Sequence, residues 1–210
     1  RALMINLGGG VVTDMGGFAA STYKRGIDFI QVPTTLLAQV DASVGGKTGI
    51  DLDNVKNIIG TFTQPKAVFI SNRFLETLDN RQIVSGFAEI IKHGLIQDKS
   101  LYQRCKTIDL DAIPFQLIRD SVAIKNTVVL EDPTEQGLRK ILNFGHTIGH
   151  AIEGYSLQHD ADPLPGETFA MRQHRCDRDR GGQKTGHAGR EHLADRVRVV
   201  GEAAHQLAVL

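Results

Sequence analysis

The opening residues of the chain constrain its fold more than any other stretch. An apolar run over residues 2–7 predicts a buried strand, the glycines of residues 8–10 predict a tight turn, and the small residues after them predict a helix. α/β domains use this order of elements to bring backbone N–H groups up to a phosphate. Thr13 stands where the third glycine of a G-x-G-x-x-G motif would fall, so close packing of the helix on the strand explains the glycines equally well. A chain that opens inside a core strand is also expected to derive from a longer parent.

Two further strands are predicted, over residues 27–32 and 67–70. The first of them is followed directly by Thr34 and Thr35. Hydroxyl groups at the carboxyl end of a strand lie where open α/β sheets bind ligands. The first part of the chain is therefore expected to form a parallel sheet with crossover segments.

The pattern changes to helices near residue 80. Ile83, Phe87 and Ile90 fall at helical intervals, and apolar residues continue this spacing further along the chain. We therefore expect a partial Rossmann-like α/β domain over residues 1–75, followed by an all-helical domain over residues 76–171.

A glycine-rich segment precedes the third predicted strand. Its Gly46-Lys47-Thr48 resembles the end of a P-loop, but Asp41 stands where that motif needs its first glycine, so a nucleoside triphosphatase is rejected. Lys47, with Lys56 and Asn57 after it, still predicts an anion pocket on mobile backbone. Lysines at the surface in water are an equally good explanation of these residues.

Glu89, Lys92 and His93 share one face of a helix predicted over residues 85–94. A surface Glu–Lys pair would explain the first two. However, the helix is almost wholly apolar, and burying a charge is costly unless the group is paired or binds a metal ion. Glu89 is therefore a candidate metal ligand.

His146 and His150 lie four residues apart in an apolar pattern that predicts a helix over residues 142–153, so they project from one face. Two imidazoles at this spacing can bind one divalent ion, and Glu89 would complete a site suited to zinc. Ordinary histidines bonded to the neighbouring backbone explain the spacing equally well.

The composition argues against several classes of protein. Basic and acidic residues are equal at 24 each, so no overall charge favours nucleic acid or a membrane surface. The apolar and charged fractions, 41% and 23%, are those of an ordinary globular protein. The sequence shows no membrane-spanning run, no signal-peptide pattern and no C-x-x-C motif, so we expect a cytoplasmic protein.

Taken together, these motifs resemble the 3-dehydroquinate synthases, which are NAD- and metal-dependent sugar phosphate cyclases of the shikimate pathway. The resemblance extends to about residue 170, and that family has an α/β domain followed by a helical one. The blocks that carry it are GGGVVTD at residues 8–14, YKRG at 23–26, VPTTLLAQVDASVGGKTG at 32–49, Lys56-Asn57, GFAEIIKHG at 86–94 and GLRKILNFGHTIGHAIE at 137–153.

The resemblance implies a role for each matching residue. The metal ion, zinc or cobalt, would be bound by Glu89 and His146, whereas His150 would lie near the substrate phosphate and not on the metal. NAD would be held by Gly9, Gly10, Val11, Asp14, Thr34, Thr35, Asp41, Lys56 and Thr77. The substrate phosphate and hydroxyl groups would be bound by Lys47, Lys56, Asn57, Asn143 and Arg25.

The implied reaction converts 3-deoxy-D-arabino-heptulosonate 7-phosphate to 3-dehydroquinate and phosphate. NAD transiently oxidises the substrate, phosphate is eliminated, the hydride returns, and an aldol step closes the ring. Lys92 would contact this sugar-acid phosphate near the metal. Lys125 and Arg139 would bind its carboxylate, a task that suits a bidentate guanidinium.

The resemblance also bears on partners and on rival functions. It suggests a homodimer that acts on a small molecule, without nucleic acid or membrane. The alternatives are another sugar-phosphate cyclase of the inosose synthase kind, a glycerol-type dehydrogenase, and a non-catalytic remnant that binds NAD.

Two features depart from the family pattern. The third metal ligand of the family is a histidine directly before Gly-Glu, but Pro165 stands at that position and His159 lies six residues earlier. Residues 172–210 are rich in arginine and histidine, and we expect an out-of-frame or erroneous, poorly packed tail in preference to a nucleic-acid-binding one. We therefore expect a chain truncated at both ends and inactive or nearly so.

Overall fold

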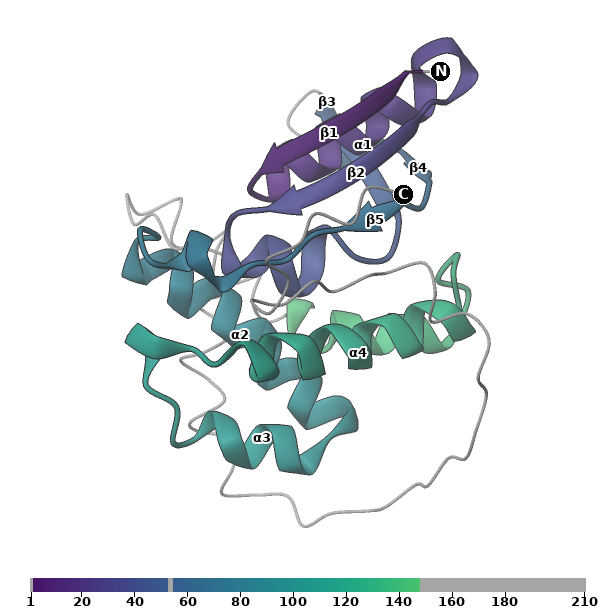
Figure 1. The fold of residues 1–210 in the computed structure, drawn as a ribbon. Helices are drawn as coiled ribbons and strands as arrows, with labels where there is room; N and C mark the ends of the chain where they lie inside the picture. Colours follow the sequence, from purple (N-terminus) through teal and green to yellow (C-terminus); the bar gives the residue numbers. More distant parts are fainter. Residues whose placement is uncertain (1, 53–54, 148–210) are drawn as a thin grey trace.

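The computed structural model of the chain describes residues 2–52 and 55–147, with residues 55 and 56 described in their backbone only. Some predictions lie outside this description, namely those for His150, His159, Pro165, the tail over residues 172–210 and the side chain of Lys56. The described residues form a small sheet with one helix against it, set beside a layer of helices (Figure 1).

The first part of the chain forms a three-stranded parallel sheet, as predicted (Figure 1). Its strands are β1 (Leu3–Gly8), β2 (Asp28–Pro33) and β5 (Ala67–Val68), in the order β1-β2-β5. Leu3 pairs with Asp28 and Gly8 with Pro33, so β1 and β2 end at the same edge of the sheet. The crossover helix α1 (Gly10–Thr22) follows β1 and packs against both strands.

Glycines let α1 lie close to β1. A Cβ on Gly16 would lie 2.2 Å from Oδ1 of Asn6 in β1, and a Cβ on Gly8 would lie 2.6 Å from Cγ2 of Val12. Neither distance leaves room for a side chain. Close packing of helix on strand therefore accounts for Gly8, the explanation that the sequence had left open.

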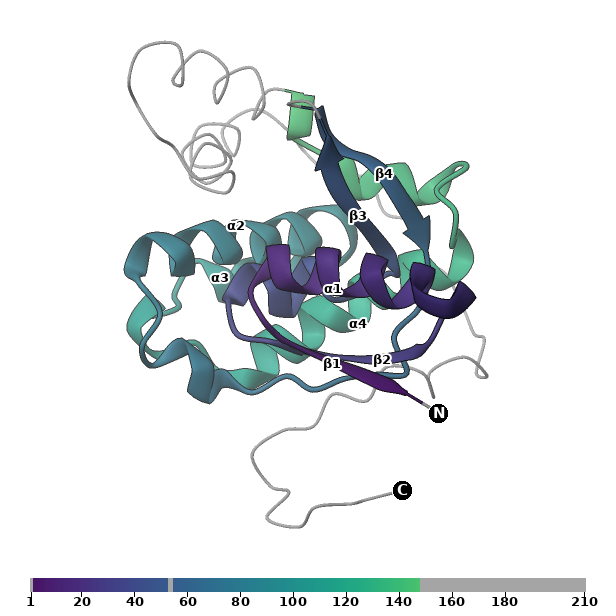
Figure 2. The same cartoon turned by 90° about the horizontal axis from the view of Figure 1, so that it is seen from above.

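An antiparallel hairpin of β3 (Lys47–Leu52) and β4 (Val55–Phe62) lies over α1 (Figure 2). The backbone around Lys47, predicted to be mobile, is thus a regular strand, because Lys47 pairs with Phe62 and Thr48 with Thr61. The sequence carries only a weak signal for this hairpin, because Asp53-Asn54 between two β-compatible runs lacks the glycine of the preferred two-residue turns.

Between β2 and the hairpin the chain forms a π-helical turn, η2 (Ala38–Ala42), which carries Asp41. Thr35 supports the turn, since its Oγ1 accepts a hydrogen bond of 3.2 Å from the backbone N–H of Ala38. π turns are rare and frequently lie at functional sites.

The helical layer consists of α2 (Asn80–Gln97), α3 (Lys99–Cys105) and α4 (Phe115–Glu131), as predicted after residue 80 (Figure 2). Asp79 and Asp98 start α2 and α3 by accepting hydrogen bonds from the backbone N–H groups of Arg81 and Ser100. The remaining elements are the short turns η1 (Tyr23–Arg25), η3 (Asn72–Leu75), η4 (Leu110–Ala112) and η5 (Leu138–Asn143). Within the described residues no helix combines the length and the apolar character that crossing a membrane requires.

The helix predicted over residues 142–153 begins later than expected, since residues 142 and 143 belong to η5 and the described helical residues are 146 and 147. η5 ends at Asn143, and Gly145 has a φ of 86°, a left-handed conformation that interrupts a helix. The predicted residues after 147 lie outside the description.

The main hydrophobic core is shared by the sheet part and the helical part. Leu36, which precedes η2, belongs to the same buried cluster as Ile90 of α2 and Ile118 of α4. The contact is close, because a Cβ on Gly86 would lie 2.5 Å from the backbone nitrogen of Leu37. This cluster crosses the boundary expected near residue 75, and the division into two domains stays a prediction.

The apolar run over residues 2–7 forms a strand as predicted, but the prediction that this strand is buried was wrong, because β1 and the start of α1 expose apolar side chains. Leu3, Ile5 and Leu7 are 51%, 62% and 59% exposed, and Val11 is 73% exposed. Parallel sheets usually have both faces covered. The exposed surface of β1 is therefore as apolar as a sheet face that is normally buried.

Candidate functional site

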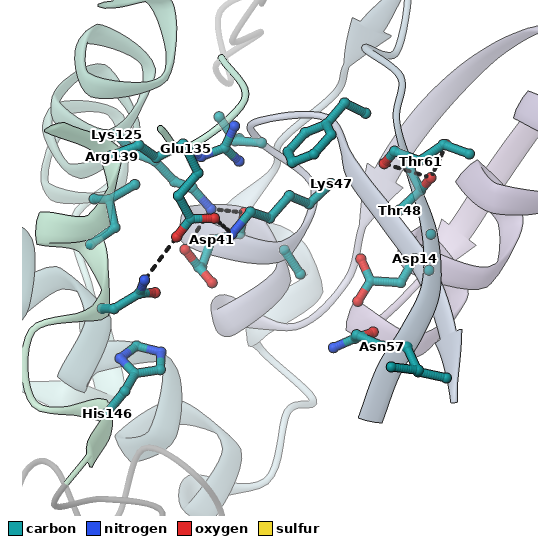
Figure 3. A pocket seen from close by; sticks show the side chains of 18 of the residues that line it. Asp14, Asp41, Lys47, Thr48, Asn57, Thr61, Lys125, Glu135, Arg139 and His146 are labelled. Atoms are coloured by element: carbon teal, nitrogen blue, oxygen red, sulfur yellow. Dashed lines mark hydrogen bonds and ion pairs between the residues drawn. The ribbon is translucent and has the colours of Figure 1, made fainter. Parts of the chain in front are cut away.

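A cavity of about 620 Å³ lies between the hairpin and the helical layer (Figure 3). Its wall brings together residues that are far apart in the sequence, from α1, η2, both strands of the hairpin, α2, α4 and η5. Most of the predicted catalytic residues lie here. The predicted site residues in the wall are Asp14, Asp41, Lys47, Asn57, Lys92, Lys125, Arg139, Asn143 and His146.

Two lysines of the helical layer are paired with carboxylates. Lys125 donates from Nζ to the backbone oxygen and to Oδ1 of Asp41, each at 2.5 Å, and its side chain is only 7% exposed. Lys92 forms an ion pair with Glu89, one turn earlier in α2. Burial would raise the pKa of Asp41, but the ammonium groups of Lys125 and Lys92 hold it below its usual range. Asp41 is therefore ionised at neutral pH.

His93 is fully buried beside these charges. Its Nδ1 lies 2.7 Å from Oγ of Ser121, and its Nε2 has no hydrogen-bond partner among the described residues. Burial, with the nearby charge of Lys92, lowers the pKa of His93 to about 3, so the ring is neutral. Its ligand atom and those of Asp41 and Glu89 all lie within 4.8 Å of one another. In the described part of the chain these three side chains form a group with the composition of a metal site.

The two residues predicted to bind the metal are not joined in that group. His146 lines the cavity, whereas Glu89 does not, although its partner Lys92 does. Burial, and then the charge of Asp41, raise the pKa of Glu89. Joint binding of one ion by Glu89 and His146 stays a prediction.

Five of the residues predicted to hold NAD lie near the carboxyl ends of β1 and β2, namely Gly9, Gly10, Val11, Thr34 and Thr35. The backbone N–H of Thr34 donates to the carbonyl of Gly8 at 2.9 Å, and a Cβ on Gly9 would lie 3.1 Å from Cγ2 of Thr35. Gly10 begins α1 and Val11 follows it, exposed. These five residues do not line the cavity, but Asp14, one turn further along α1, does.

Asp14 faces the cavity with an unusual acidity (Figure 3). Burial, and then the charge of Asp41, raise its pKa to about 7. A carboxyl group in this state can accept or donate a hydrogen bond near neutral pH.

Arg139 is 2% exposed and connects two parts of the wall. Its Nη1 donates to the carbonyl of Pro133 at 2.7 Å, and its Nη2 donates to the carbonyl of Gly45 at 2.8 Å. It thereby ties the loop before η5 to the start of the hairpin. Its predicted contact with a substrate carboxylate stays a prediction.

Two further predicted residues, Arg25 and Thr77, also lie outside the cavity wall. Arg25 is exposed in η1, beyond the carboxyl end of α1 and so at the other end of that helix from the glycine turn. Thr77 is exposed in the turn before α2. Their roles in binding substrate and NAD stay predictions.

The sequence interpretation missed Glu135, Thr48 and Thr61, which also line the cavity. Glu135 forms an ion pair with Lys47 and accepts a 2.7 Å hydrogen bond from Nδ2 of Asn143. Its position just before the matching block that starts at residue 137 was the one available signal. The threonines would have been found by recognising the hairpin.

Comparisons with known proteins agree with this arrangement. The N-terminal family profile of 3-dehydroquinate synthase matches residues 1–85, and the C-terminal profile matches residues 86–162. The chain is 55% identical over 161 residues to the 3-dehydroquinate synthase of Parabacteroides distasonis, which covers 75% of this chain and 46% of that protein. It is 58% identical over 153 residues to that of Helicobacter pylori, with 73% and 45% covered. The chain thus spans about half the length of the curated relatives it matches.

Solved structures of two other synthases share the fold. A 2-deoxy-scyllo-inosose synthase complexed with carbaglucose-6-phosphate, NAD+ and Co2+ gives a TM-score of 0.72 at 32% identity, covering 80% of this chain and 48% of that one. A 2-epi-5-epi-valiolone synthase from Streptomyces hygroscopicus subsp. jinggangensis, with NAD+ and Zn2+ bound, gives 0.68 at 30% identity, covering 83% and 52%. The cofactors expected from the sequence, NAD and zinc or cobalt, are those that these two proteins hold.

Proposed function

Because the chain belongs to the 3-dehydroquinate synthase family, we propose that it carries part of the machinery that converts 3-deoxy-D-arabino-heptulosonate 7-phosphate to 3-dehydroquinate and phosphate. The observation that carries the proposal is the cavity wall. Lys47, Lys92 and Lys125 converge there with Arg139, which gives one pocket the cations that a substrate with both a phosphate and a carboxylate requires.

The residues at the start of α1 fit NAD. This helix has no side-chain cap and no acidic residue in its first turn, so its N–H groups are available to a phosphate. Gly9 and Gly10 would lie along the pyrophosphate, and Thr34 and Thr35 would contact the dinucleotide from the end of β2. Asp14 would hold a ribose hydroxyl.

The residues around Glu89 fit a divalent metal ion. Oε2 of Glu89 is buried against the ammonium of Lys92, and the ligand atoms of Glu89, Asp41 and His93 all lie within 4.8 Å of one another. Glu89 and His146 would bind zinc or cobalt. When bound, NAD supplies reversible hydride transfer and the metal ion polarises the hydroxyl that is oxidised.

The chain's own side chains bind and orient the substrate. Lys47 and Asn143 bind its phosphate, and Lys125 and Arg139 bind its carboxylate. Lys92, held at the wall by Glu89, contacts the hydroxyls between these two ends. Fixing both charged ends brings the reacting carbons to one place and costs the protein little reorganisation.

We also propose that this chain alone turns over substrate slowly or not at all. It covers about half the length of its relatives, and Pro165 stands where the family has its third metal-binding histidine. The protein would act in the cytoplasm as a homodimer, with the nucleotide-binding and helical domains meeting near residue 75.

The second candidate is an inosose synthase-like activity on a sugar phosphate that lacks a carboxylate, because a 2-deoxy-scyllo-inosose synthase is among the solved structures that share the fold. Calorimetry of the chain with NAD and zinc would compare 3-deoxy-D-arabino-heptulosonate 7-phosphate with glucose 6-phosphate. We expect the acid to bind about tenfold more tightly, and Arg139→Gln to remove the difference. Equal affinities in the unmodified chain would favour the second candidate.

A further inference from the structure

Glu135 occupies a position at which a ligand anion would be expected. Its side chain is only 17% exposed, and its carboxylate lies between the ammonium of Lys47 and the amide of Asn143 (Figure 3). Lys47 approaches from β3 and Asn143 from η5, so the carboxylate bridges the hairpin and η5 at the wall of the cavity. Both groups that contact it are the ones we assign to the substrate phosphate.

The loop that presents Glu135 is ordered by its own hydrogen bonds. Asp132 accepts from the backbone N–H groups of Gln136 at 2.8 Å and Gly137 at 2.7 Å. Glu135 itself has a φ of 60°, a left-handed conformation that glutamate rarely adopts. The loop therefore holds this side chain over the cavity at a cost in backbone strain. Such strain is typical of functional positions, which suggests that the carboxylate has a role in ligand binding.

We propose that Glu135 is a specificity-determining residue that occupies the anion subsite and competes with the ligand's phosphate for Lys47 and Asn143. This inference rests on the proposed function, which assigns those two residues to phosphate. A ligand enters only if its own charge and hydrogen bonds replace those of the carboxylate. A phosphate does so because it offers more charge and more acceptor oxygens than a carboxylate or a hydroxyl. Ligands without a phosphate leave Glu135 in place.

An ion pair with a purely structural role would respond differently to mutation. Such a pair would link groups that have no other task, and removing its acid would weaken the site or leave it unchanged. In contrast, an internal competitor weakens binding at the site that it fills, so that its removal strengthens the affinity for an external anion.

Titration calorimetry with inorganic phosphate tests this competition on the full chain. We expect Glu135→Gln to bind phosphate about tenfold more tightly than the unmodified chain, a change of about 1.4 kcal/mol. Glutamine keeps an oxygen that can accept from Asn143, so the loop is retained. Glu131→Gln is the matched control, because Glu131 is exposed at the end of α4, does not line the cavity and carries the same charge.

A second variant keeps the test valid if Glu135→Gln fails to fold. Glu135→Gly removes the carboxylate and suits a φ of 60°, so it is expected to fold even if Glu135→Gln does not. It should show the same gain in affinity, and adding Lys47→Gln to either variant should abolish the gain.

Each outcome decides the inference. Unchanged or weaker phosphate binding in Glu135→Gln or Glu135→Gly would overturn it, as would an equal gain in Glu131→Gln, which would indicate net charge alone. The proposed function fails separately. In that case the Glu135 variants bind phosphate more tightly, but neither they nor the unmodified chain bind the sugar-acid phosphate better than inorganic phosphate.

Discussion

The two walls of the cavity hold their charges in different ways. On the helical wall, Lys125 and Lys92 are buried, and each has a carboxylate beside it. On the hairpin wall, Lys47 is half-exposed, and its partner Glu135 comes from a loop. A buried ion that loses its partner stays in a medium of low dielectric, whereas water replaces the partner of an exposed one. The site therefore combines charges that must stay paired with charges that can be exchanged for those of a ligand.

The strongest test of this difference removes one lysine from each wall. Lys125→Met leaves Asp41 without its ammonium, and we expect the free energy of unfolding to fall by about 4 kcal/mol. Lys47→Met should lower it by about 0.5 kcal/mol or less. Urea denaturation of both variants measures this, and equal losses would show that the two walls do not differ.

The pH dependence of stability tests whether the hairpin shields Asp14, in the wall of the cavity, from water. The pKa of Asp14 is raised to about 7, so between pH 4 and 7 the folded chain keeps a proton that the unfolded chain has released. Stability due to this group therefore falls as the pH rises through that range. We expect Asp14→Asn to gain about 2 kcal/mol relative to the unmodified chain between pH 4 and 7, roughly half of what the shift implies, because the carboxyl faces an open cavity. Denaturation at several pH values checks this, and a constant difference would mean that Asp14 is solvated.

Substitutions at two glycines test whether the helical wall is more tightly packed than the loop that carries Glu135. Gly86→Ala places a Cβ 2.5 Å from the backbone of Leu37, and we expect a loss of about 1.5 kcal/mol in unfolding free energy. Gly137, in the loop near Glu135, has nothing within 4 Å of the position of a Cβ, so Gly137→Ala should be close to neutral. If thermal denaturation gave both variants the same melting temperature, the helical wall would be no more tightly packed than the loop.

The smallest effect is expected within the hairpin. Thr61 lies 2.8 Å from the hydroxyl of Thr48 and 2.9 Å from that of Ser21, so its hydroxyl links both strands to α1. Thr61→Val should lower the unfolding free energy by about 1 kcal/mol. Thr127→Val, at an exposed position on α4, serves as the control, and an equal loss there would remove the special role of Thr61.

The sequence predicted those parts of the fold that repeat a simple pattern. β2 and the helical spacing of Ile83, Phe87 and Ile90 were predicted correctly, because burial of one face imposes the pattern. β1 was predicted correctly as a strand, but its predicted burial was wrong, since Leu3, Ile5 and Leu7 are exposed. The β3–β4 hairpin was missed because its glycines, which allow close approach to neighbouring backbone, resemble those of a loop.

The candidate site shows the same limit. Family motifs identified Lys47, Lys92 and Asp41, and the structure brings them to one cavity. No local pattern could show that Glu135 reaches Lys47, since the two residues are far apart in the sequence and meet only where η5 contacts the hairpin through Arg139. Likewise, the pairing of Lys125 with Asp41 depends on how α4 crosses η2.

The hydrophobic cluster that joins Leu36 to Ile90 and Ile118 has a mechanical consequence. This cluster packs the segment that carries Asp41 against the helices that carry Lys92 and Lys125, so the three elements form one rigid unit. The ion pair of Lys47 with Glu135 lies outside this unit, and its lysine is half-exposed. A ligand can therefore replace that pair while Lys92 and Lys125 keep their positions.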